Sequence, residues 1–486
     1  MGEQTLPGHR YEPTGRARAT VTSKISGALG GLRAAMTGRV LEPTDDQYDT
    51  ARMVWNAGID RRPALITQAA SAADVAAAVR FGTEHGLEIT VRGGAHSTAG
   101  AGVANDGLMI DLSLLNDVTV DPVARRVGVG GGALLRDMDA ATQAHGLAVP
   151  SGLVGHTGVG GLALGGGMGW LSRRCGLTID NLLAAEIVTA DGQIRRATAA
   201  ENPDLFWAIR GGGGNFGVVT NFEFQAHKVG PIVQFGLFFW GADQGADALR
   251  AIRDVTRALP RDVNIVVACM NAPPAPFVPE KHQSAPGYAA LVSGFGCAEE
   301  HAAVAGALRA RLAPLFEFVT PMPYVDLQQL LDEANAAGQF YYDKGTDLAD
   351  LSDNVIAVVT DHMQRRSSPQ SVALFYPLGG AFSKVGEDDT AFGGGRTPHY
   401  SLVMVGTALD PEVLVAERAW VRSFWAALQP LASGIGSYVN LMAEFEPDRV
   451  RASYGPAKYE RLARIKAKYD PGNVFHHNAN IKPAAV

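Results

Sequence analysis

Four glycine-rich loops lie between Gly93 and Gly214, and each adjoins an apolar run with the composition of a β-strand. One such loop is weak evidence, because glycine also marks ordinary turns and bulges. Several together predict backbone packed against a large polyanionic ligand, since glycine has no Cβ to keep peptide N–H groups from phosphate oxygens. The first loop also presents a histidine, His96. The loops are residues 93–94, 130–132, 158–169 and 211–214.

The size and composition are those of a globular protein that can hold two cores: 486 residues, 47% of them hydrophobic and 19% charged. The net charge is −7 without a cluster of Lys and Arg, so we expect no nucleic-acid partner. No apolar run reaches about 18 residues, and the N-terminus lacks a signal-peptide pattern. We therefore expect no membrane contact and a cytoplasmic location. The oligomeric state is not readable from the sequence.

The three cysteines, Cys175, Cys269 and Cys297, are odd in number and widely spaced. This spacing argues against a disulfide framework and against a zinc site. The His476-His477 pair has no HxxxH or CxxC pattern beside it. We therefore expect no bound metal.

The order of strand and helix patterns divides the chain into an N-terminal arm (1–44), a first domain (45–230), a second domain (231–430) and a tail (431–486). The first forty residues read as a loose arm followed by a short amphipathic helix. The first domain alternates many short strands with helices. Glycine loops become rare after Gly217, and the second domain instead predicts an antiparallel sheet covered by amphipathic helices.

Individual elements follow from capping and turn signals. Ser71 is a plausible N-cap for an alanine-rich helix over residues 72–85, which Gly86 ends. Asp191-Gly192 predicts the turn of a β-hairpin. In the second domain the expected strands are residues 263–270, 289–295, 372–377 and 401–407, and the expected helices are residues 247–258, 299–312, 325–335 and 411–428.

Ordered motifs then identify a family. The chain contains RGGAHS at 92–97, GHTGVGG at 155–161, CGLTIDN at 175–181, NFGVVT at 215–220, YVN at 438–440 and DPGNVF at 470–475. In this order they resemble the berberine-bridge-enzyme-like FAD-linked oxidases of the vanillyl-alcohol-oxidase superfamily, whose FAD-binding domain is of the p-cresol methylhydroxylase type. The resemblance spans roughly residues 45–230 and 430–482. A Rossmann domain is disfavoured, because Gly158–Gly161 lacks the GxGxxG spacing and its acidic partner.

The resemblance implies an α+β, two-domain flavoprotein. Its FAD-binding domain is built from both chain ends, and the middle segment roofs the substrate site. His96 stands where the family joins the flavin to the protein, which implies an 8α-histidyl FAD bond, although most relatives have Gly in place of Ala95. The position that often supplies a second, cysteinyl bond is Val154, which cannot form a thioether. We therefore expect FAD to be covalent through His96 only, and Cys175 to be a packing residue.

The same resemblance implies further FAD contacts in each motif. The glycine pattern of residues 158–169 predicts that Gly160, Gly161 and Gly165–Gly167 expose N–H groups to the pyrophosphate, and a tight turn in a compact core is the alternative. By pattern alone Asn181, Val188 and the strand at Gly217 also read as ordinary core residues. The implied cofactor-binding residues, besides His96, are Arg92, Gly93, Gly94, Ala95, Ser97, Gly152, Val154, Gly155, Thr157, Gly158, Gly160, Gly161, Asn181, Val188, Gly217, Val219, Asn440 and Asn478.

Two residues align with reactive positions of the family. Thr157 aligns with the position that gates oxygen near the flavin, where valine accompanies oxidases and isoleucine accompanies dehydrogenases. Threonine has nearly the shape of valine, so we expect molecular oxygen to be the electron acceptor. Tyr438 aligns with a position that often supplies the catalytic base. A tyrosine has a pKa near 10 and needs a partner to serve as a base.

Other assignments for the base stay open. The family usually has a second tyrosine where Leu441 stands here, and Tyr438 also reads as a plain core tyrosine. If Tyr438 is only a core residue, the base lies in the middle segment, and the candidates are Tyr324, Tyr341 and Glu333.

The expected function is an FAD-dependent oxidation of a small molecule. The reaction removes hydride from a CH–OH or CH–N group and passes the electrons to oxygen. One alternative is a flavin dehydrogenase with another acceptor. A second is a protein that sequesters a redox-active natural product, because relatives serve in antibiotic pathways and in self-protection. The identity of the substrate is not readable, because residues 233–427 contain no motif.

Overall fold

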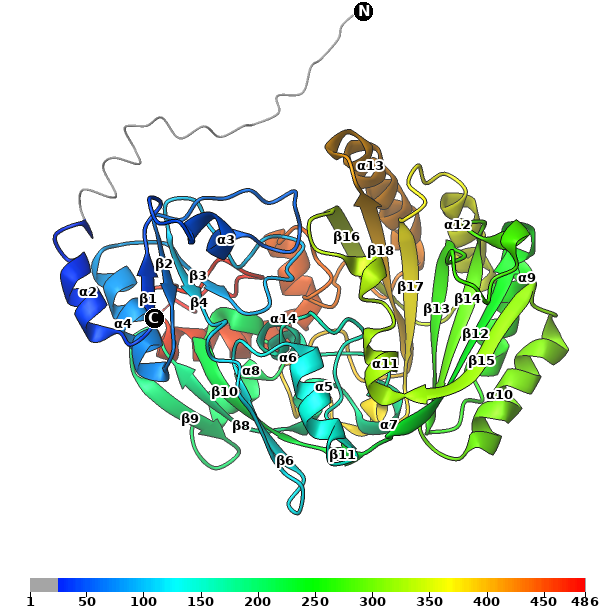
Figure 1. Cartoon of the computed structure of the whole chain (residues 1–486), viewed down its shortest axis with the longest axis horizontal. Helices are drawn as coiled ribbons and strands as arrows, with labels where there is room; N and C mark the ends of the chain where they lie inside the picture. The colour runs from blue at the N-terminus through cyan, green and yellow to red at the C-terminus, as the bar shows by residue number, and fades with distance from the viewer. Residues whose placement is uncertain (1–24, 486) are drawn as a thin grey trace, which may run out of the picture.

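The computed structural model describes residues 25–485 of the chain. Figure 1 shows two small sheets on the left and one large sheet with its helices on the right. The first small sheet has the order β1-β2-β4-β3, in which β2 and β3 both run parallel to β4. Its strands are β1 (Arg39–Leu41), β2 (Leu65–Gln68), β3 (Ile89–Arg92) and β4 (Leu108–Asp111).

Helix α4 (Ala72–Glu84) packs on this sheet as its sequence predicts. The Ser71 side chain caps the helix by accepting a hydrogen bond from the Asp74 N–H. Val75 and Val79 share a core with Leu65 and Leu108 of the strands. The short helix expected at the end of the arm is α2 (Leu29–Ala35), and α3 (Tyr48–Arg52) follows β1. The rest of the expected arm, residues 1–24, lies outside the described residues.

The second small sheet is antiparallel throughout, with the order β5-β6-β10-β8-β9. The predicted hairpin is confirmed, because Gly192 adopts a φ of +70° in the turn between β8 and β9. The strands are β5 (Val118–Asp121), β6 (Arg126–Gly130), β8 (Leu182–Val188), β9 (Ile194–Thr198) and β10 (Val218–Gln225). A short pair, β7 (Leu147–Ala148) with β11 (His227–Lys228), lies at its border.

The C-terminal helix α14 (Pro447–Tyr469) packs against this N-terminal half. Leu462 and Ile465 of α14 share one core with Phe206 and Phe216. The two ends of the chain are therefore joined through one apolar cluster. The other helices of this half are α5 (Leu135–Gln143), α6 (Val159–Gly165), α7 (Ser172–Cys175) and α8 (Pro203–Ile209).

The large sheet has seven antiparallel strands in the order β15-β12-β14-β13-β17-β18-β16. One face packs on α9 (Gly245–Thr256), α10 (Ala298–Arg311), α12 (Asp353–Met363) and α13 (Pro411–Leu428). The other face packs on residues of the first half, among them Leu153 and Trp170. The strands are β12 (Ile232–Gly241), β13 (Val263–Asn271), β14 (Pro286–Gly294), β15 (Phe316–Pro323), β16 (Phe340–Leu348), β17 (Val372–Leu378) and β18 (His399–Ala408).

The antiparallel sheet covered by helices is thus as predicted, but three of its strands, β12, β15 and β16, were not expected. The helix expected over residues 325–335 is shorter: α11 (Tyr324–Gln329) ends early, and a separate 3₁₀ turn follows at Glu333–Asn335. The boundaries of the two domains stay a prediction. Within the described residues, no helix is long and apolar enough to cross a membrane.

Candidate cofactor and active site

A cavity of about 400 Å³ lies where the glycine loops, the tail and strand β17 meet. Most of the residues implied by the family motifs line its wall. Those in the wall are Gly93, Gly94, Ala95, His96, Ser97, Gly152, Val154, Thr157, Gly158, Gly160, Gly161, Gly217, Val219, Tyr438, Asn440 and Asn478. The fold therefore brings together segments that are more than 300 positions apart in the sequence, such as the loop of His96 and the segment of Tyr438.

The glycines of the first three loops allow neighbouring backbone segments to pack in close contact. A Cβ on Gly94 would lie 2.2 Å from the Gly158 nitrogen, and a Cβ on Gly158 would lie 2.3 Å from the Gly94 nitrogen. A Cβ on Gly131 would lie 2.2 Å from the carbonyl oxygen of Val219. No side chain fits at these contacts, so the close packing of loop on loop itself requires glycine.

The wall also has the features that a polar ligand needs. Three of its polar atoms are buried without a hydrogen-bond partner: Thr90 Oγ1, His477 Nδ1 and Asn478 Oδ1. Buried polar groups are nearly always paired, so these atoms suit a ligand with donors and acceptors. A Cβ at Gly161 would meet no atom within 4 Å, which leaves open space beside the loop. The residues present therefore fit a bound dinucleotide.

Four of the implied residues lie behind the wall. The Arg92 guanidinium pairs with Asp111 at 3.0 Å, and the Gly155 N–H donates to Asp332 Oδ1 at 2.6 Å. The Asn181 amide donates to the carbonyl of Leu177, and Val188 is part of an apolar core. These contacts hold the loops in shape, and any contact of the four with FAD stays a prediction.

The loop Gly165–Gly167 has a different role from the expected one. A Cβ on Gly165 would lie 2.3 Å from Asn440 Oδ1, and one on Gly167 would lie 2.0 Å from Thr178 Oγ1. These glycines are absent from the cavity wall. The expectation that this loop offers N–H groups to a pyrophosphate is wrong for Gly166 and Gly167, because the Gly166 N–H donates to the carbonyl oxygen of Ala163 and the Gly167 N–H donates to the Tyr438 hydroxyl.

His96 lies within a stack of four rings. Its ring centroid is 4.2 Å from that of Trp55 and 5.1 Å from that of His156, and Tyr341 covers the other side of Trp55 at 3.7 Å. Burial, together with the nearby His156, lowers the pKa of His96 to about 3. The imidazole is therefore neutral near pH 7 and has a lone pair available as a nucleophile.

The backbone conformation of Ala95, the residue before His96, explains why most relatives have glycine at this position. Ala95 has a φ of +57°, in the left-handed region that glycine adopts without strain. Its carbonyl oxygen accepts a hydrogen bond from the Trp55 N–H at 3.0 Å, which fixes this conformation. The strain at Ala95 is thus part of how the loop presents His96.

Tyr438 has the partners that the sequence could not name. Its hydroxyl oxygen accepts hydrogen bonds from the Gly167 N–H at 2.7 Å and from the Asn440 amide at 2.8 Å. Both donors favour the phenolate, but burial outweighs them and raises the pKa of Tyr438 to about 12. The three alternative bases, Tyr324, Tyr341 and Glu333, are not part of the wall.

Thr157 and Val154 both line the cavity, but Cys175 does not. Burial raises the pKa of the Cys175 thiol to about 11, so the thiol stays protonated near neutral pH. These positions agree with the interpretation of Cys175 as a packing residue. Whether a single covalent bond to the flavin forms stays a prediction.

Several wall residues were missed by sequence reasoning. Tyr376 comes from β17, which contains no family motif, and His477 follows the DPGNVF motif in the tail. Within the described residues, the wall contains no Asp, Glu, Lys or Arg. The other missed residues with large side chains are Ile89, Leu112, Leu153, Leu162, Leu164, Met168, Phe222, Leu441, Met442, Phe445 and Phe475.

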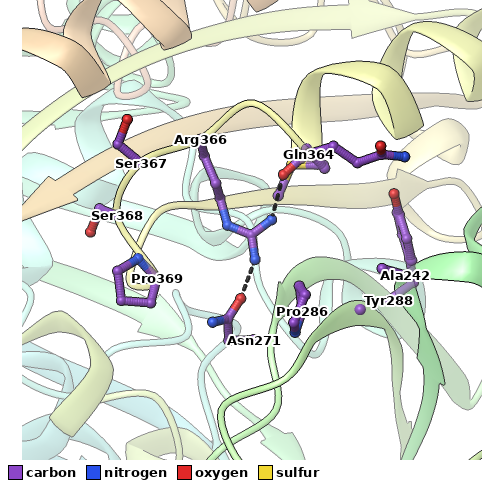
Figure 2. A pocket seen from close by; sticks show the side chains of 11 residues that line it. Ala242, Asn271, Pro286, Tyr288, Gln364, Arg366, Ser367, Ser368 and Pro369 are labelled. Atoms are coloured by element: carbon purple, nitrogen blue, oxygen red, sulfur yellow. Dashed lines mark hydrogen bonds between the residues drawn. The ribbon is translucent and has the colours of Figure 1, made fainter.

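A second cavity, of about 360 Å³, lies at the other end of the large sheet and contains none of the implied residues. Figure 2 shows Arg366 reaching across it to Asn271. The guanidinium also donates to the carbonyl oxygen of Met363 at 2.8 Å. Neutral acceptors therefore hold this cation, and the cavity has no glycine loops like those of the first.

Comparison with known proteins agrees with this geometry. Residues 63–198 match the FAD binding domain family, and residues 437–482 match the family described as berberine and berberine like. An FAD-linked oxidoreductase of Dictyostelium discoideum is 31% identical over 430 residues, which cover 88% of this chain and 91% of the relative. The (R)-6-hydroxynicotine oxidase of Paenarthrobacter nicotinovorans is 29% identical over 463 residues, which cover 92% of this chain and 97% of the relative.

A solved structure gives the same result for the fold. The crystal structure of 6-hydroxy-D-nicotine oxidase from Arthrobacter nicotinovorans superposes with a TM-score of 0.81 at 27% identity, covering 92% of this chain and 98% of that one. The chain therefore belongs to the berberine-bridge-enzyme-like family of FAD-linked oxidoreductases, and it is an FAD-binding enzyme. The predicted family and enzyme class are confirmed.

Proposed function

We propose that this enzyme oxidises a CH–OH or CH–N group of a small, uncharged molecule and passes the electrons to molecular oxygen. The observation that supports this best is the single wall shared by a neutral His96, the glycine loops and Tyr438. The names of relatives agree with it, because (R)-6-hydroxynicotine oxidase and 6-hydroxy-D-nicotine oxidase are named as oxidases of a small molecule.

The first glycine loop, with Gly158–Gly161, Val219 and the tail residues His477 and Asn478, would hold FAD. FAD supplies a two-electron acceptor when bound. His96 supplies the neutral nitrogen for one covalent bond to it, and Val154 leaves no second nucleophile at the aligned position. The unpaired polar atoms of His477 and Asn478 would find partners on the cofactor.

Tyr438 would remove the proton that the substrate loses as its C–H bond is oxidised. Its oxygen is held by Gly167 and Asn440, which fix its position and stabilise the phenolate. Tyr376, in the same wall, closes the cavity from the large sheet. In this proposal the tail supplies the proton acceptor and the middle segment supplies part of the substrate-facing surface.

The side chains packed with Tyr438, namely Met168, Tyr376 and Leu441, carry no charge, so an ionic substrate group beside Tyr438 would be buried without a counter-ion. The pyrophosphate of FAD would instead lie against N–H groups of the glycine loops. The apolar side chains packed with Tyr438 in the wall, Met168 and Leu441, favour a largely apolar molecule over one rich in hydroxyl groups.

The test is flavin absorbance without oxygen. Neutral aromatic alcohols and amines are added anaerobically to the purified protein, and oxygen is then admitted while peroxide is measured. We expect bleaching with at least one compound, followed by rapid recovery with stoichiometric peroxide. Bleaching with slow recovery in air indicates a dehydrogenase instead, and tight stoichiometric binding without bleaching indicates a sequestering protein.

A further inference from the structure

His156 lies beside the proposed attachment residue, and no family motif assigns it a role. Its Nδ1 is 3.2 Å from His96 Nε2, within hydrogen-bond distance. The two ring planes are inclined by only 28° with centroids 5.1 Å apart, so an in-plane N–H of one ring can point at the nitrogen of the other. One of these two nitrogens must carry the proton and the other must accept it, because two lone pairs at this distance repel.

The surroundings decide which nitrogen donates. His156 Nε2 lies 3.5 Å from the backbone carbonyl oxygen of Asp332, which can only accept. The proton of a neutral His156 therefore sits on Nε2, and its Nδ1 presents a lone pair to His96. His96 must then carry its own proton on Nε2, which leaves His96 Nδ1 unprotonated. One carbonyl thus sets the tautomers of both rings.

The position of that carbonyl is itself fixed. The carboxylate of Asp332 accepts the Gly155 N–H at 2.6 Å, so the turn at Asp332 is tied to the residue before His156. On the opposite side, Trp55 stacks on His96 at 4.2 Å and limits the tilt of its ring. The two imidazoles are therefore positioned by contacts from three separate segments of the chain.

We propose that His156 is a positioning residue for flavin attachment: it directs the lone pair of His96 to Nδ1 and accepts the Nε2 proton as the bond forms. This inference rests on the proposed attachment through His96. The reaction forms a bond from His96 Nδ1 to the 8α methyl carbon of the flavin and breaks one C–H bond of that methyl group. The Nε2 proton of His96 leaves toward His156.

The electrons balance with oxygen as the oxidant. The methyl carbon is oxidised by two electrons, which reduce the flavin, and molecular oxygen then takes these electrons with two protons to give hydrogen peroxide. Without a proton acceptor, the alkylated imidazole would be a cation in a buried stack. Burial already lowers the pKa of His96 strongly, so this site disfavours such a cation. Transfer to the half-exposed His156 gives the proton a path to solvent.

The experiment follows covalent attachment in the full chain with FAD and air, by intact mass after denaturation. His156→Ala should bind FAD without covalent attachment at first and attach it at least about 10²-fold more slowly, as expected for loss of a positioned base. His145→Ala, which removes an exposed histidine outside the cavity, is the matched control and should attach FAD at the wild-type rate. If His156→Ala does not fold, His156→Asn serves in its place, because it keeps an acceptor but cannot take a proton.

Rescue separates proton transfer from packing. Added imidazole should speed attachment in His156→Ala and leave the wild-type rate unchanged, since only a lost proton acceptor can be replaced from solution. Attachment at the wild-type rate in His156→Ala, or slow attachment that imidazole does not restore, would overturn the inference. His96→Ala tests the proposed linkage separately: if it still attached FAD, the site of attachment would be wrong irrespective of His156.

Discussion

At the scale of single residues, Ala95 adopts a strained backbone conformation, and this conformation positions His96. Alanine at a φ of +57° is strained, and glycine adopts this conformation freely. Ala95→Gly should therefore stabilise the protein by about 1 kcal/mol in denaturant unfolding. Ala101→Gly, in the same loop but without a positive φ, is the matched control and should destabilise it by roughly 0.5–1 kcal/mol. Equal effects from both variants would show that Ala95 carries no strain.

Tyr438 makes a prediction about both rate and pH. Tyr438→Phe should slow anaerobic flavin reduction by about 10²–10⁴ while FAD remains bound. The pKa of Tyr438 is raised to about 12, so the basic form grows steadily as the pH rises through the neutral and alkaline range. The wild-type rate should therefore increase with pH without a plateau below that value, and the variant should lose this dependence. Tyr324→Phe, which removes the hydroxyl of a tyrosine outside the wall and keeps Tyr438, is the control.

A wild-type reduction rate in Tyr438→Phe would place the base elsewhere. None of the three alternatives from the middle segment lies in the wall, so a residue other than these would then be required.

Thr157 makes a prediction about oxygen. Thr157→Ile adds bulk in the cavity wall, so we expect slower reoxidation of reduced flavin and nearly unchanged reduction by substrate. Stopped-flow measurement of the two half-reactions separates these effects, and Thr157→Val, which conserves shape, is the control. A slowed reduction with normal reoxidation would show that Thr157 contacts the substrate and does not gate oxygen.

The residue scale also shows where motifs succeed and where they fail. The motif order placed His96, Thr157 and Tyr438 in one cavity although they come from three segments. It could not reveal the partners of Tyr438, because Gly167 lies 271 positions away and is brought near only by packing. It also misread Gly165–Gly167, since a glycine needed for tight packing on protein has the same sequence signature as one needed for a ligand.

At the scale of elements, a buried ion pair within the tail also contacts the FAD-binding half, through the backbone of Asn215. The Lys466 ammonium donates to Asp470 at 2.6 Å and to the backbone carbonyls of Asn215 and Phe475, and both side chains are fully buried. Asp470 also accepts the N–H groups of Val474 and Phe475. The contact thus joins α14, the fourth glycine loop and a segment of the cavity wall.

Removing one partner of this pair should be costly. Lys466→Met leaves the Asp470 carboxylate buried without its cation, and we expect a loss of about 3–5 kcal/mol of stability. Lys468→Met is the matched control, because Lys468 pairs with Asp204 at the exposed surface, and it should cost at most about 1 kcal/mol. Denaturant midpoints compare the two variants, and a similar small effect from both would contradict a structural role for the buried pair.

Elements were predictable where local signals were strong. The capped helix α4, the Asp-Gly hairpin and α13 all follow from local sequence. Strand β16 was missed because Asp343 and Lys344 interrupt its apolar pattern. These charges are satisfied only by residues distant in the sequence: Thr98 donates to Asp343 at 2.7 Å, and Lys344 pairs with Glu446 at 3.1 Å. β15 was missed because it contains two prolines and has alternate residues exposed.

At the scale of the whole molecule, the candidate active site is built from segments that are distant in the sequence. The glycine loops come from the first half, Tyr376 from the large sheet, and Tyr438 from the segment before the last helix. The sequence identified the loops and the tail because they have fixed motifs. It could not define the proposed substrate surface, because the wall there consists of ordinary apolar side chains that only the fold brings together.

The central claim is that FAD is bound in this cavity by one covalent bond, to His96. Intact mass of the denatured protein tests it most directly, with wild type, His96→Ala and Cys175→Ala measured side by side. We predict one covalent FAD in wild type and in Cys175→Ala, and none in His96→Ala, with visible flavin absorbance following the same pattern. Covalent FAD that persists in His96→Ala, or that disappears in Cys175→Ala, would contradict this account.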